Sequence, residues 1–158
     1  MKKIITKKNI LIGFIALFIL IQFFRIDKST LPVNPKTDFI STLQCSDDVS
    51  GVLKKACYDC HSNQAQYPWY TNIAPVSWWI KHHINEGSDH LNFSIWETYT
   101  PKRKDHKLEE CIEMIEEGEM PMKSYTWMHK EAKLTLDEKQ LLINWFKAEK
   151  LKLNYIKE

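Results

Sequence analysis

The sequence contains little glycine and little proline, four and six residues among 158, which argues against collagen-like and low-complexity chains. It also lacks a basic body: residues 31–158 hold 16 Lys and Arg against 19 Asp and Glu, although the whole chain carries +2. A nucleic-acid-binding domain is normally basic over its folded part, so we expect no nucleic-acid partner. The positive charge comes from residues 1–30, where six basic residues face one acidic residue. The length suits a single domain of ordinary size.

One long hydrophobic run is present, at residues 10–24, interrupted by Gln22 and preceded by Lys7 and Lys8. As a helix it would span about 22 Å, less than the roughly 30 Å of a bilayer core. Snorkelling of flanking basic side chains can close that difference, so we expect a single N-terminal transmembrane helix. A cleaved signal segment is the alternative, but no small-x-small site follows the run, and no cysteine follows for lipidation.

The charge distribution around this run predicts the location of the rest of the chain. Basic residues precede the run and few follow it, which places the N-terminus in the cytoplasm and the body on the periplasmic, extracytoplasmic side. We therefore divide the chain into an anchor or signal segment over 1–25, a linker over 26–38 and a domain over 39–158. The linker assignment depends on Pro32, Pro35 and the small polar residues around them.

Alternation of apolar and polar residues, the sign of a half-buried strand, is missing from the body, and helical periodicity replaces it. Four helices are predicted, over about 47–56, from 76 to a stop at Gly87, from 108 to a stop at Gly118, and from Thr135 to about 151. Thr135 and Glu138 have the spacing of a capping box. The fold class is therefore all-α, with long loops at 61–74, 88–104 and 119–134 that suggest a cofactor within the core.

The strongest motif is Cys57-Tyr58-Asp59-Cys60-His61, the C-x-x-C-H attachment signature of c-type haem. Two thiols three residues apart can form thioethers with the two vinyl groups, and the next residue offers an imidazole to the iron. A thioredoxin-like pair would need a βαβ context, a zinc site would need a second ligand pair, and a disulfide would leave His61 without a role. We therefore predict one covalent haem c held by Cys57, Cys60 and His61.

The sequence around this motif resembles the bacterial haem-binding domain family, whose members are membrane-anchored, single-haem, cytochrome c-like proteins. The resemblance covers about residues 38–150, and its clearest segments are 56–63, 67–70, 72–79, 90–94, 118–121 and 124–127. It implies an exported haem c in a cytochrome c-like helical domain. Cys45 and Cys111 lie outside the family pattern, and either a disulfide between them or two free thiols is open.

The second iron ligand is expected in the loop after Gly118. Met120 precedes Pro121, which favours an extended backbone there, and a methionine sulfur is the usual second ligand of an electron-carrying haem c. Met122 is the alternative, and a histidine such as His83 or His90, or an open position, would also complete the site.

These residues predict an electron carrier on the outer face of the cytoplasmic membrane, not an enzyme with a small-molecule substrate. Its redox partner protein is left unidentified. A haem-based sensor or peroxidase-like enzyme with an open iron position is the alternative, as is a haem-binding accessory module of a membrane complex.

Overall fold

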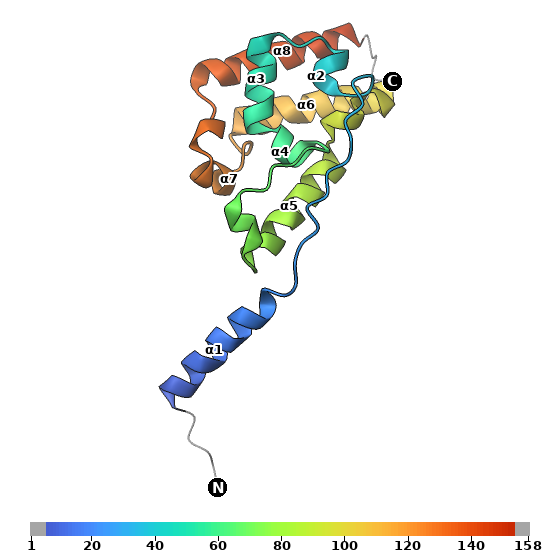
Figure 1. Ribbon diagram of the computed structural model, residues 1–158. Helices are drawn as coiled ribbons and strands as arrows, with labels where there is room; N and C mark the ends of the chain where they lie inside the picture. Colours follow the sequence, from blue (N-terminus) through green and yellow to red (C-terminus); the bar gives the residue numbers. More distant parts are fainter. Residues whose placement is uncertain (1–5, 154–158) are drawn as a thin grey trace.

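The computed structural model describes residues 6–153 and places helices and connecting segments there, without a β-strand (Figure 1). The all-α prediction is therefore confirmed for this range. In chain order the elements are α1 (Lys7–Ile21), α2 (Phe39–Thr42), α3 (Asp47–Ala56), α4 (Tyr58–His61), η1 (Trp69–Asn72), α5 (Val76–His90), η2 (Phe93–Thr98), α6 (Pro101–Glu117), α7 (Lys123–Met128), η3 (Lys130–Ala132) and α8 (Leu136–Lys152).

The four predicted helices correspond to α3, α5, α6 and α8, and the segments expected as long loops contain short helices. η1, η2, α7 and η3 occupy parts of these segments, and α6 starts at Pro101, well before the predicted position. Elements of three to six residues are too short to show a helical hydrophobic period, so the sequence pattern did not reveal them.

The core lies where α3 and α6 pack against α8, and the predicted apolar stripes supply it. Its fully buried members include Val49 and Leu53 of α3, Leu108 of α6, and Leu142 and Phe146 of α8. In each helix these residues recur at spacings of three or four, which places them on one face. This three-helix layer is the rigid base on which the rest of the body rests.

Two helix ends in this layer follow the predicted chemistry. Thr135 and Glu138 form the capping box: the Thr135 hydroxyl accepts the Glu138 N–H at 3.2 Å, and the Thr135 N–H donates to the Glu138 carboxylate at 2.9 Å. Gly118 ends α6 with φ of +74°, a left-handed conformation that glycine adopts without strain. The chain thereby turns sharply from α6 into the segment that carries Met120.

α5 extends from the three-helix layer toward the C-terminal end of α1, and α4 packs along it (Figure 1). α1 itself projects from the body, with its large apolar side chains exposed. Within residues 6–153, the helices fall short of the combined length and hydrophobicity needed to cross a membrane. Residues 22–38 run in extended form along the body and are held there near Thr37, whose hydroxyl donates to the Ser94 carbonyl at 2.9 Å.

Candidate functional site

The Cys57–His61 motif forms a tight helical turn directly after α3. Cys57 interrupts the helix with φ of −126° and ψ of −42°, and its carbonyl accepts the N–H of Cys60 at 3.2 Å and of His61 at 3.0 Å. The side chains of all three residues line one cavity. The spacing in sequence thus becomes one surface that presents two thiols and an imidazole together.

His61 is oriented by backbone groups of α5. Its Nδ1 lies 2.9 Å from the Gly87 carbonyl and 3.1 Å from the Leu91 carbonyl, so the Nδ1–H donates to them and Nε2 is the basic nitrogen. Burial lowers the pKa of His61, although the two carbonyls favour the charged form. A neutral imidazole with a fixed tautomer is the form in which histidine ligates a metal.

Gly87 permits α5 to approach the motif closely, and this corrects the prediction that it ends the helix. α5 continues to His90. A Cβ at Gly87 would lie 2.9 Å from the Cys60 carbonyl oxygen and 3.2 Å from the Cys60 Cβ, closer than real Cβ atoms pack. The glycine therefore serves packing between α4 and α5, and it brings the carbonyls that orient His61 within hydrogen-bonding distance.

The cavity beside the motif has a volume of about 430 Å³, within the range of small-molecule sites, and its wall is mostly apolar. α3 and α4, the C-terminal half of α5, the second half of α6, and residues 120–125 enclose it. Its charged lining residues are Glu86, Lys107 and Glu110, and Lys107 donates to Glu110 at 2.5 Å. An apolar wall with a few polar groups suits a large flat ligand that carries ionisable substituents at one edge.

Both predicted methionines lie at this cavity. Met120 and Met122 are half-buried members of its wall, and they are joined by Met114 of α6. His83 and His90 also line it from α5. The structure therefore gathers every candidate second ligand named from the sequence, and the choice of Met120 stays a prediction.

Four thiols are free, so the optional disulfide between Cys45 and Cys111 is not formed. Cys111 instead lines the cavity beside the motif, whereas Cys45 packs against the core. Burial raises the pKa of Cys57 to about 12 and of Cys60 to about 11. Both motif cysteines are therefore neutral thiols at physiological pH, which is the form that adds to a vinyl group with conservation of hydrogen.

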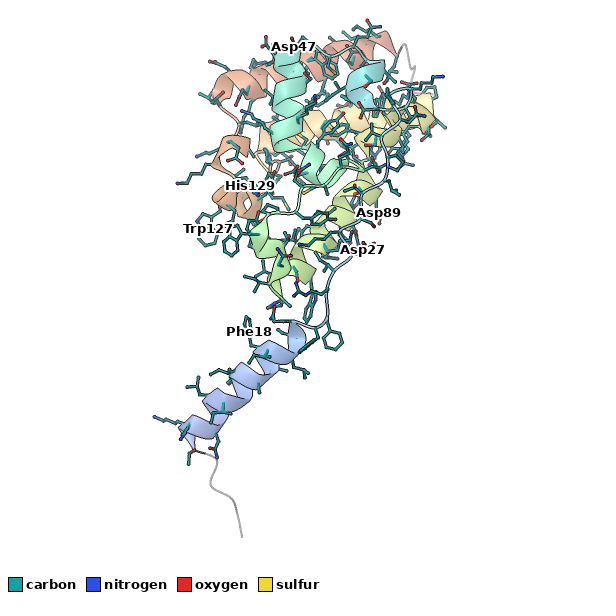
Figure 2. All side chains as sticks on the ribbon, viewed as in Figure 1. Phe18, Asp27, Asp47, Asp89, Trp127 and His129 are labelled. Atoms are coloured by element: carbon teal, nitrogen blue, oxygen red, sulfur yellow. The ribbon has the colours of Figure 1, made fainter. Side chains whose placement is uncertain are left out.

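A polar network that the sequence did not predict joins α7 to the motif. The Tyr125 hydroxyl donates to Asp59 at 2.7 Å, and the Tyr125 ring stacks on His129 at 4.4 Å. His129 also lies 2.5 Å from the Tyr70 hydroxyl (Figure 2 shows His129 between α7 and the middle of the body). Burial raises the pKa of Asp59, while the Tyr125 hydroxyl opposes that rise. Because Tyr125 lines the cavity, this network holds one wall in place.

Comparison with protein families gives one match, to a model described as a haem-binding domain, over residues 16–148. Neither the curated proteins nor the solved structures contain a match to the chain. The residues present fit such a group: an apolar cavity of adequate volume, an imidazole with a defined tautomer, and two neutral thiols on the same wall. The match covers most of the sequence, and the chain therefore belongs to the haem-binding domain family.

Proposed function

We propose that the protein attaches one haem covalently, through thioethers at Cys57 and Cys60, with His61 as the proximal iron ligand. The observation that carries this proposal is the shared cavity wall: both thiols and the imidazole line it, and two backbone carbonyls engage the His61 Nδ1. In a zinc or disulfide site the third side chain would have no such cavity. Haem held by a proximal histidine is an established type of ligation.

The proposed role is electron transfer in a cytochrome c-like domain, with Met120 as the second ligand and Met122 as the alternative. When bound, haem supplies a one-electron iron couple. The chain supports that role in two ways: the apolar wall excludes water, and the lowered pKa of His61 keeps the imidazole neutral. A methionine sulfur would raise the reduction potential relative to a second imidazole.

The proposed location is the outer face of the cytoplasmic membrane, with α1 as the anchor. α1 exposes nine large apolar side chains or more from residue 10 onward, and Lys7 and Lys8 begin it. Its 15 residues span about 22 Å, so the basic side chains at both ends would have to reach the headgroups, or the bilayer would thin.

Extraction of the haem tests the covalent attachment. The full chain is produced with a cytochrome c maturation system, and its haem is extracted with acidified acetone from wild type and from two double variants. Cys57→Ala/Cys60→Ala should release its haem, whereas the matched control Cys45→Ala/Cys111→Ala, which also loses two thiols, should retain it. Complete release of haem from the wild type would refute the attachment.

Carbon monoxide separates an electron carrier from a sensor or peroxidase-like enzyme. A carrier whose iron has two protein ligands should give the same reduced spectrum with and without carbon monoxide. Its oxidised spectrum should contain a sulfur-to-iron charge-transfer band. Rapid binding of carbon monoxide by the wild type would contradict the carrier and favour an open iron position.

A further inference from the structure

The end of the body nearest α1 exposes large apolar side chains. We name this surface the tip and define it as residues 69–81, which comprise η1 and the first part of α5. Its exposed aromatic residues are Trp69, Trp78 and Trp79, with 70%, 39% and 48% of their surface accessible, and Ile73 and Val76 are also exposed. Contiguous exposed apolar side chains of this kind mark an interaction surface.

Direct hydrogen bonds attach the tip to the C-terminal end of α1. The Gln22 side chain donates to the Ala74 carbonyl at 3.0 Å and accepts the Ala74 N–H at 2.9 Å. The Trp78 indole N–H donates to the Phe24 carbonyl at 2.8 Å. Three bonds within three residues of chain hold the two segments in one orientation, so the tip cannot swing freely about the end of the helix.

Lys28 extends the same attachment. Its ammonium donates to Thr71 at 2.9 Å and to Asn72 at 2.7 Å. The family match begins at residue 16, inside α1, so these contacts fall within the matched domain. The junction between α1 and the body is thus a packed, hydrogen-bonded part of the domain.

The occupant of this surface follows from its chemistry and its position. Phe23 and Phe24, which end α1, are 78% and 65% exposed, so the apolar surface of the helix continues into the tip (Figure 2 shows Phe18 on the same helix, close to this junction). No acidic residue occurs at positions 60–85, although the chain contains 20 of them, and Arg25, Lys28 and Lys81 lie in or beside the tip. Tryptophan, basic groups and an absence of acidic groups match the headgroup region of an anionic bilayer.

We propose that the tip lies in the headgroup region of the same bilayer that α1 enters, an inference that rests on the proposed anchoring by α1. The bilayer surface is then a second contact of the domain, in addition to the anchor. α5 rises from the tip at Val76 to Gly87 beside His61, eleven residues or about 16 Å along its axis. The haem cavity is thereby held at a set height, where a membrane-bound redox partner can present its own centre.

Photo-crosslinking of the full-length holoprotein tests the proposal. The protein is reconstituted in vesicles of phosphatidylcholine and phosphatidylglycerol, with p-benzoylphenylalanine replacing Val76, Trp79 or Leu151 in separate preparations. Val76 and Trp79 lie in the tip. Leu151, 79% exposed near the end of α8, is the matched control, because α8 lies on the far side of the body from α1 (Figure 1). Vesicle flotation, the haem absorbance and lipid adducts found by mass spectrometry are the three measurements.

The expected result is co-flotation of all three proteins with the vesicles and lipid adducts at positions 76 and 79, at least fivefold above those at 151. Co-flotation with equal adducts at all three positions would overturn the inference and leave the anchor intact. Loss of co-flotation would overturn the anchor and the inference together. Adducts from position 76 or 79 to a second copy of the chain, in place of lipid, would assign the tip to a protein contact and overturn the bilayer assignment.

Discussion

Replacing Gly87 with alanine is expected to destabilise the protein, although alanine is the better helix former. The added Cβ would lie 2.9 Å from the Cys60 carbonyl oxygen and 3.2 Å from the Cys60 Cβ. Both atoms belong to the rigid turn of the motif, so neither can move aside by a side-chain rotation. The helix α5 must therefore shift away from α4, which is the packing that orients His61.

The magnitude follows from two opposing terms. Forcing an extra methyl group into a packed contact costs about 1–3 kcal/mol. The gain in helix propensity from glycine to alanine offsets about 1 kcal/mol of this. Gly51→Ala in α3 is the matched control, because a Cβ at Gly51 has no neighbour within 4 Å. That variant should only gain helix propensity, so the difference between the two variants isolates the steric cost, about 1–3 kcal/mol.

Guanidinium unfolding of the full-length protein in detergent, followed by circular dichroism, measures both free energies of unfolding. The haem absorbance of each folded variant provides a second measurement, since the Gly87 carbonyl accepts the His61 Nδ1–H. Gly87→Ala should lower the unfolding midpoint and perturb the spectrum, whereas Gly51→Ala should raise the midpoint with an unchanged spectrum. Equal stabilisation by the two substitutions would refute the close contact between α4 and α5.

Three further substitutions test other parts of the domain. Met120→Ala should abolish the sulfur-to-iron charge-transfer band and allow carbon monoxide binding, while Met122→Ala should preserve the spectrum; the reverse pattern would reassign the ligand. Tyr125→Phe removes the hydroxyl that donates to the buried carboxylate in α4, and denaturant unfolding should show a loss of about 1.5–3 kcal/mol. Hydrogen bonding from Lys55 lowers the pKa of Glu138, so its stabilisation exists above pH 4.5 and is lost as pH falls through the folded-state pKa. Glu138→Gln should therefore cost less than about 1 kcal/mol at pH 7 and nothing at pH 2, as measured by unfolding at each pH.

Local signals in the sequence predicted much of the helical layer. The apolar stripes of α3, α6 and α8, the capping box at Thr135 and the left-handed end at Gly118 all depend on residues within about one or two helical turns of each other. Such patterns follow from helix geometry alone, so they can be recognised without knowledge of the neighbouring elements. The short helices after His61 escaped prediction because they have no such repeat.

The partners of the motif could not be predicted from local patterns. The carbonyls of Gly87 and Leu91 lie 26 and 30 residues from His61, and the hydroxyl that reaches Asp59 lies 66 residues away. The glycine at position 87 has two possible uses, as a helix end or as a close contact, and only the packing of α4 on α5 distinguishes them. Likewise, nothing near Gln22 in the sequence indicates its pairing with Ala74.

The sequence by itself determined the chemistry of the site, because the two thiols and the imidazole of residues 57–61 come from one continuous segment. It also determined the helical class, through periodicities that any helix must satisfy. Only the tertiary structure decided the tautomer of His61, the enclosure of the cavity and the attachment of the tip to α1. The physical reason is that these features arise from contacts between elements distant in sequence, whose approach depends on the packing of the whole domain.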